Sequence, residues 1–246
     1  MKVIVFNDSN ALAEFAASEF IELLKKKPTA VICLASGDSP KLTCELFVKK
    51  ATTEKINLES FIFIGLDEWV GLSPKTKGSC ESDFQNRLFA PLGIRPSQYH
   101  LFDGLSNNLE KECADMDAFI KEKGGIDLMV VGIGMNGHIG FNEPGVDFNL
   151  LSHVIDLDET TVSVGQKYFS EPVSLQKGIT LGLGHLMNSK KLLLLANGKR
   201  KSMVIKKAVE ETISNLFPAS IIQQHPESYV LIDEDAGSLL DKSKIK

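Results

Sequence analysis

Segments that are apolar at every position alternate along the whole chain with segments whose apolar residues recur at helical spacing. The segments 30–35 and 192–196 consist only of Ala, Val, Ile, Leu and Cys. Strands of this kind are buried on both faces, which is typical of a parallel sheet covered by helices on both sides. The alternation therefore predicts an α/β fold: a single-domain Rossmann-like parallel sheet flanked by helices on both faces, spanning residues 1–246.

The other elements follow the same pattern. Further strands are expected at 2–6, 61–66, 126–131 and 229–232. Helices are expected at 10–27, 41–53, 81–89, 109–123 and 201–211, the first of them with Ser9 as its N-cap. No linker, repeat or low-complexity stretch divides the 246 residues, which suits one large α/β domain.

The composition excludes several classes of function. A net charge of −5 and a pI of about 5.6 argue against nucleic-acid binding. We expect no secretion signal, because the first six residues resemble a strand, and no membrane contact, because no apolar stretch reaches membrane-spanning length. The four cysteines lack a C-x-x-C pair and zinc-like spacing, so reduced thiols and a cytoplasmic location are expected.

The expected strand 126–131 runs directly into a glycine-rich loop at 132–145 that contains His138 and Glu143. Ligands of open α/β sheets bind beyond the carboxyl ends of the strands, where glycines let the backbone approach them closely. His138 and Glu143 give this loop two groups that can move protons. They do not have metal-site spacing, and no metal is expected. The alternative is a tight turn with one surface histidine.

A second loop, 66–72, follows the expected strand 61–66 and contains the adjacent carboxylates Asp67 and Glu68 beside the only tryptophan, Trp69. Apolar surroundings raise the pKa of a carboxylate and suit it to general-base catalysis. The alternative is that Asp67 only caps the loop.

A third loop, Ser36-Gly37-Asp38-Ser39-Pro40, follows the strand 30–35. Ser39 is expected to cap the next helix, and the free amides at that helix start suit a phosphate. The carboxylate of Asp38 would repel a phosphate, so we expect it to point away. A capped turn without a ligand is an equally good explanation of this loop.

Three cations, Lys199, Arg200 and Lys201, follow the strand 192–196 at an expected helix start, against the preference of the helix dipole. A bound anion would explain them, and a solvated surface cluster is the alternative. In a parallel sheet all these loops share one edge. Together they indicate proton transfer on a phosphorylated small molecule without a cofactor.

Three motifs resemble the glucosamine-6-phosphate deaminase/isomerase family: Leu66-Asp67-Glu68-Trp69-Val70-Gly71-Leu72, the string from Gly132 to Gly145, and Pro218-Ala219-Ser220 with His225. The resemblance implies conversion of a hexosamine 6-phosphate to a ketose 6-phosphate plus ammonia. Trp69 and the segments 78–81 and 177–183 resemble the galactosamine branch. They favour galactosamine 6-phosphate to tagatose 6-phosphate, with glucosamine 6-phosphate to fructose 6-phosphate as the alternative.

The resemblance also implies roles for individual residues. Asp67 would carry a proton from C2 to C1, and His138 would assist ring opening, oriented by Glu143. Asn136 would bind the substrate or the histidine. The phosphate would lie on the loop from Ser36 to Ser39, with Asp38 as an unusual member, and on Lys201. Lys167 stands where many relatives have arginine, which leaves its role open.

Two other functions remain possible on the sequence alone. A 6-phosphogluconolactonase would use His138 to activate water instead of deprotonating C2. A sugar-phosphate sensor would bind without turnover, although no DNA-binding extension accompanies this chain. A homo-oligomer is possible.

Overall fold

The computed structural model describes residues 1–244, and residues 245 and 246 lie outside the described part. The strands are β1 (Lys2–Phe6), β2 (Val31–Leu34), β3 (Ile62–Gly65), β4 (Asp67–Trp69), β5 (Tyr99–His100), β6 (Leu128–Val131), β7 (His153–Asp156), β8 (Lys177–Thr180), β9 (Leu192–Ala196) and β10 (Ser228–Asp233). The α-helices are α1 (Ser9–Lys26), α2 (Asp38–Thr53), α3 (Cys80–Phe84), α4 (Ala90–Leu92), α5 (Leu109–Glu122), α6 (Glu159–Gly165), α7 (Leu183–Asn188), α8 (Ser202–Glu210) and α9 (Glu234–Gly237).

Seven strands form a sheet in the order β1-β10-β9-β6-β2-β3-β5, and every pair in it is parallel. All residues of β2, β6 and β9 are buried, as their uniformly apolar sequences predicted. Along β2, Val31 and Cys33 belong to one hydrophobic cluster and Ile32 and Leu34 to the other. Helices α5, α7 and α8 contribute to the first cluster and α1 and α2 to the second, so the expected α/β fold with helices on both faces is confirmed.

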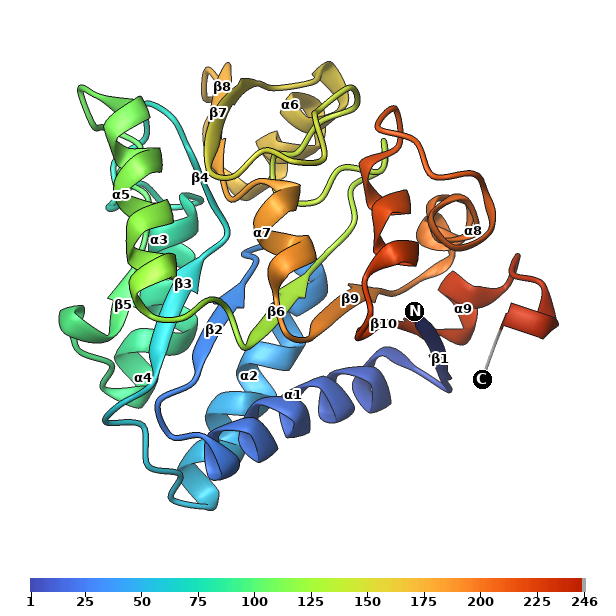
Figure 1. Cartoon of the computed structure of the whole chain (residues 1–246), viewed down its shortest axis with the longest axis horizontal. Helices are drawn as coiled ribbons and strands as arrows, with labels where there is room; N and C mark the ends of the chain where they lie inside the picture. The colour runs from blue at the N-terminus through green and yellow to red at the C-terminus, as the bar shows by residue number, and fades with distance from the viewer. Residues whose placement is uncertain (245–246) are drawn as a thin grey trace.

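A second sheet, β4-β8-β7, is antiparallel and was not expected from the sequence. Figure 1 shows it with α6 beyond the end of the main sheet toward which β2, β3 and β6 point. Leu66 alone separates β4 from β3, so the chain passes from the main sheet directly into the small one. Asp67 is therefore the first residue of a strand instead of a loop residue, which fixes its backbone at the carboxyl edge.

Several helix boundaries differ from the expected ones. The N-cap of α1 is Asp8, whose carboxylate accepts the Ala11 amide at 2.8 Å, and Ser9 is the first helical residue. Helix α2 starts at Asp38, three residues earlier than expected. The expected helix 81–89 is part of a longer helical stretch in which a π-helix, Gln85–Phe89, joins α3 to α4. No α-helix in the described part of the chain has the length and apolar character that a bilayer crossing requires.

Candidate active site

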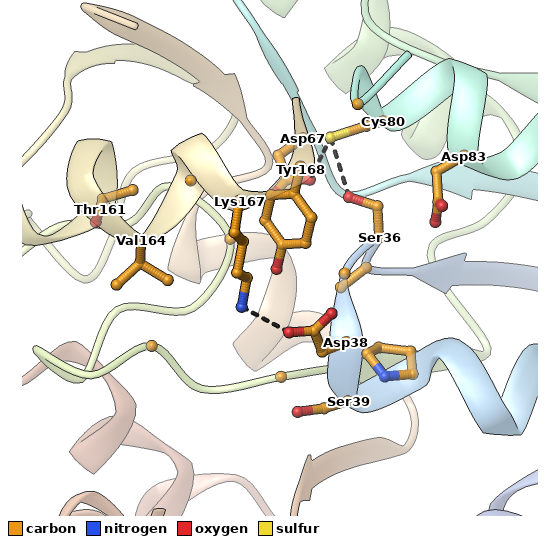
Figure 2. Close-up of a pocket in the computed structure, with 18 of the residues that line it drawn as sticks. Ser36, Asp38, Ser39, Asp67, Cys80, Asp83, Thr161, Val164, Lys167 and Tyr168 are labelled. Atoms are coloured by element: carbon orange, nitrogen blue, oxygen red, sulfur yellow. Dashed lines mark hydrogen bonds and ion pairs between the residues drawn. The ribbon is translucent and has the colours of Figure 1, made fainter. Parts of the chain in front are cut away.

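A cavity of about 350 Å³ opens at the carboxyl edge of the main sheet. Its walls come from the loops that follow β2 and β6, from β4, from residues 77–87 around α3, from the segment around α6 and from the turn after β9. It contains most of the residues that the sequence singled out: Ser36, Gly37, Asp38, Ser39, Asp67, His138, Lys167 and Lys201. Figure 2 shows Asp67, Ser36, Asp38, Ser39 and Lys167 facing this space from different elements. The expected convergence of the loops on one edge is confirmed.

Asp67 has the environment of a carboxylate that can accept a proton near neutral pH. Burial raises its pKa to about 7, and the neighbouring charge of Glu68 adds to the effect. The thiol of Cys80 opposes this rise because it donates a hydrogen bond to Oδ1 at 3.5 Å. Ser36 Oγ donates in turn to Cys80 Sγ at 3.0 Å, so two hydrogen bonds link Asp67 to the loop after β2 (Figure 2).

Glu68 has a different role from its neighbour. Its carboxylate accepts the backbone N–H groups of Trp69 at 2.8 Å, Cys80 at 3.0 Å and Glu81 at 2.8 Å. It therefore anchors the start of α3 beside β4 and places Cys80 next to Asp67. The capping role that was the alternative for Asp67 belongs to Glu68, which leaves the Asp67 carboxylate available.

The glycine-rich loop is shaped to hold the His138 ring. The Gly134 amide donates to the His138 carbonyl at 2.9 Å, which closes the turn. A Cβ on Gly134 would lie 2.3 Å from Cε1 of His138, so only glycine leaves room for the ring. Gly137 has φ 86°, a left-handed conformation that glycine adopts without strain.

His138 is held on one side of its ring. Its Nδ1 lies 3.0 Å from Thr161 Oγ1 and 3.6 Å from Glu143 Oε2. Asn136 donates its side-chain amide to the same Glu143 oxygen at 3.0 Å, and its own Oδ1 accepts the His138 amide at 3.2 Å. Burial would raise the pKa of Glu143, but the interactions with His138 and Asn136 outweigh it and keep the pKa low. A negative Glu143 thus supports the ring at Nδ1 and leaves Nε2 for chemistry.

The loop after β2 ends in an open helix start. Gly37 is the N-cap of α2, with φ 108° and no side-chain cap, and Ser39 lies within the first turn. The expected Ser39 cap is therefore wrong, because the left-handed glycine starts the helix earlier. The Asp38 carboxylate does not point away from the site as expected. It faces the cavity and pairs with Lys167 Nζ at 2.6 Å (Figure 2).

Lys201 lines the same cavity from a 3-10 turn, Lys199–Lys201, that precedes α8. Its ammonium donates to the carbonyl of Ile133, at the start of the glycine-rich loop. Burial and the nearby charge of Arg200 lower its pKa to about 8. The expected helix start at Lys201 is one residue early, and the cation is held inside the cavity instead of in solvent.

Three cavity residues were missed from the sequence: Cys80, Thr161 and Tyr168. The sequence gave no sign that Cys80 lines the cavity, because a thiol without a basic neighbour resembles a small hydrophobic residue. Thr161 and Tyr168 belong to the stretch 159–168, for which no element was expected. His225 from the third motif lies elsewhere, buried with Nε2 2.9 Å from the Ser189 carbonyl. Among residues 1–244 no three His, Cys, Asp or Glu side chains are grouped as metal ligands would be.

The family model described as "Glucosamine-6-phosphate isomerases/6-phosphogluconolactonase" matches residues 7–231. A glucosamine-6-phosphate deaminase of Bacillus pumilus is 39% identical over 240 residues, which cover 97% of this chain and 100% of that protein. Glucosamine-6-phosphate deaminase 1 of Bacillus subtilis is 35% identical over 240 residues, covering 97% of this chain and 99% of the relative.

Solved structures show the same similarity. The structure of a monomeric glucosamine-6-phosphate deaminase superposes with a TM-score of 0.94 at 35% identity, covering 98% of this chain and 100% of that one. The 6-phosphogluconolactonase of Trypanosoma brucei superposes with a TM-score of 0.78 at 15% identity over 98% of each chain. The second similarity concerns the fold alone.

Proposed function

The chain belongs to the family of glucosamine-6-phosphate isomerases and 6-phosphogluconolactonases, and on that premise we propose that it converts glucosamine 6-phosphate and water into fructose 6-phosphate and ammonia. The observation that carries the proposal is that Asp67, a carboxylate with a pKa of about 7, shares one cavity with His138 and Lys201. A base, a group for ring opening and a cation for the phosphate are what this reaction needs.

The reaction starts with opening of the pyranose ring. His138 Nε2 gives a proton to the ring oxygen, and the C1 hydroxyl gives its proton to water, which produces an aldehyde at C1. Glu143 and Thr161 support the step because they contact Nδ1 and hold the ring in place. Asn136, a neutral amide, keeps Glu143 in place and takes no proton itself.

The aldehyde makes the C2–H bond acidic, and Asp67 then removes the C2 proton to give an enolamine. Returning that proton to C1 gives an imine at C2, and water hydrolyses the imine to a ketone and ammonia. A base with a pKa near the working pH serves both directions of this transfer. No electron is transferred to or from the sugar, so the proposal includes no redox cofactor. The proton transfers are assigned to Asp67 and His138, and the proposal includes no metal.

The phosphate is proposed to lie on Ser36, Gly37 and Ser39, between Lys201 and Lys167. The start of α2 has no side-chain N-cap, and the helix dipole favours an anion there. Lys201 is largely desolvated, which strengthens its attraction for a phosphate. Asp38 belongs to the same loop, and its negative charge opposes a phosphate there.

Glucosamine is the better-supported sugar. The relatives described above are named for glucosamine 6-phosphate, and nothing in them supports the sequence-based preference for galactosamine. The residues behind that preference have packing roles. Trp69 packs against Phe141 and Phe169 with ring centroids 4.6 Å and 6.0 Å away, and a Cβ on Gly78 or Gly178 would collide with Phe169 or Phe141.

Ammonia release from the purified protein tests the proposal. We expect turnover of glucosamine 6-phosphate with a higher kcat/KM than galactosamine 6-phosphate, assayed side by side with 6-phosphogluconolactone. A higher kcat/KM for galactosamine 6-phosphate would support the preference for galactosamine that the sequence indicates. Rapid lactone hydrolysis without ammonia would instead support a lactonase, and binding without turnover a sensor.

Three further expectations are part of the same proposal. Residues 1–246 act as one domain, since the strand order of the main sheet interleaves both halves of the chain. A homo-oligomer stays a prediction for sedimentation to test, although one solved relative is described as monomeric. A cytoplasmic location accords with four buried, unpaired cysteines.

Replacement of Cys80 should shift the pH dependence of the reaction. Its thiol stabilises the charged form of Asp67, so Cys80→Ala should raise the pKa of Asp67 and move the acidic limb of the kcat/KM profile to higher pH. Cys80→Ser keeps a donor and should leave the limb at or below its original pH. Cys113→Ala, the same change at a buried cysteine in α5, is the control. Identical profiles for all variants would remove Cys80 from the environment of the base.

A further inference from the structure

The cation Lys167 is already paired with an anion of the protein. Asp38 Oδ2 lies 2.6 Å from Lys167 Nζ and 3.7 Å from Arg200 Nη2. The three side chains come from α2, from the 3-10 turn after α6 and from the turn before α8. The Asp38–Lys167 ion pair therefore connects the start of α2 to the 3-10 turn after α6 (Figure 2). Lys167 also lies over the Tyr168 ring, 4.9 Å from its centroid.

Asp38 also occupies the helix start itself. It is the first residue of α2, where a carboxylate interacts favourably with the helix dipole. Backbone amides, Lys167 and Arg200 are the groups that a phosphate ester would use at this edge. The carboxylate therefore already interacts with two of these groups, Lys167 and Arg200, that the ligand of the proposed function would use.

We propose that Asp38 is a built-in competitor of the substrate's phosphate group, which must take Lys167 from the Asp38 carboxylate when it binds. The inference rests on the proposed function for the position of the phosphate. A dianionic phosphate offers two charges and several acceptor oxygens against the single charge of Asp38, so it displaces the carboxylate. A sugar without a phosphate has no group to exchange and leaves the pair intact.

The competition lowers phosphate affinity and increases selectivity for dianions. The side chains of Asp38 and Lys167 are 50% and 38% exposed, so solvent screens the pair and it can open without a large cost. When it is closed, the pair ties the stretch around α6 to α2 across the mouth of the cavity. Phosphate binding thus breaks the ion pair between Asp38 and Lys167 and forms a new one between the phosphate and Lys167.

A double-mutant cycle with inorganic phosphate as the probe tests this competition. Dissociation constants would be measured by calorimetry at pH 7 and low salt for the wild type, Asp38→Asn, Lys167→Met and the double variant. At pH 7 Lys201 stays largely protonated, since its pKa is about 8. Asp38→Asn should bind phosphate about tenfold more tightly, because the ligand gains a free cation and loses a like-charged neighbour.

The gain in phosphate affinity from Asp38→Asn should depend on Lys167 and on the salt concentration. In the Lys167→Met background the same change should improve binding by only about twofold, and the difference should shrink as salt screens the charges. Asp156→Asn is the matched control, because Asp156 also pairs with a lysine, Lys177 at 2.7 Å, but neither residue is among those that line the cavity. It should change phosphate affinity by less than Asp38→Asn does.

Several results would overturn the inference. Weaker phosphate binding by Asp38→Asn would mean that Asp38 holds Lys167 in place for the ligand instead of competing with it. Equal gains from Asp38→Asn and Asp156→Asn, equal gains in both Lys167 backgrounds, or no phosphate binding by any variant would also contradict it. Phosphate binding needs no turnover, so a failure of the deaminase assay would be distinguishable from a failure here.

Discussion

Replacing Asp67 with asparagine should lower kcat for ammonia release by roughly two to four orders of magnitude, the range for a lost general base. The amide keeps the shape of the carboxylate but cannot accept the C2 proton. KM should change little, since the phosphate is held by other residues. Initial rates with glucosamine 6-phosphate measure the effect, and circular dichroism and the thermal midpoint check that the variant folds.

The neighbourhood of Asp67 supplies a matched control. Asp83→Asn removes another carboxylate of the same cavity that pairs with Arg87 at 2.7 Å and has no part in the proposed proton transfer. We expect it to keep kcat within about tenfold of the wild type, below the range for a lost base. Near wild-type ammonia release by Asp67→Asn, or an equal loss in both variants, would remove Asp67 from the mechanism.

Replacing His138 with glutamine should lower kcat by roughly a hundredfold or more, through slower opening of the sugar ring. The defect should be of a different kind from that of Asp67→Asn. When ring opening limits the rate, breaking of the C2–H bond no longer does, so deuterium at C2 should slow the variant less than it slows the wild type. Rates with protonated and C2-deuterated glucosamine 6-phosphate measure this difference.

A deuterium effect that is larger in His138→Gln than in the wild type would contradict the ring-opening role, because it would place His138 in the proton transfer itself. Thr161→Val is a useful companion variant. It removes the hydroxyl 3.0 Å from Nδ1 but leaves Glu143, so it should show a weaker form of the same defect.

The main sheet could be predicted because its central strands are buried on both faces. Burial of this kind requires apolar residues at every position, and β2 and β9 show that requirement directly in their sequences. The loops at the carboxyl edge could be predicted for a related reason. Once the sheet is parallel, the residues that follow its strands must meet, which brought Asp67, His138 and Lys201 together.

The small antiparallel sheet could not be predicted from the sequence. Its strands are short, and β4 consists of Asp67, Glu68 and Trp69, which resembles a polar loop. Glu68 fits there only because three backbone amides satisfy its buried carboxylate, and two of them belong to residues 80 and 81. Such long-range hydrogen bonds are not visible in local sequence patterns.

The direction of Asp38 was wrong for a similar reason. A carboxylate in a phosphate loop was expected to turn away because of repulsion, but its partner Lys167 is 129 positions along the chain. The preference for galactosamine, which the named relatives do not support, had a different basis. Trp69, Gly78 and Gly178 pack against phenylalanine rings, and Trp69 and Gly78 also line the cavity. Packing therefore explains these residues without reference to the C4 hydroxyl.

The central claim is that one carboxylate, Asp67, moves a proton from C2 to C1 on one face of the sugar. The most direct test converts C2-deuterated glucosamine 6-phosphate in D₂O at low conversion. Deuterium then reaches C1 both when Asp67 passes on the deuteron from C2 and when it first exchanges that deuteron with solvent. The claim predicts fructose 6-phosphate with deuterium in a single one of the two C1 positions, as read by NMR. Equal labelling of both C1 positions would contradict it.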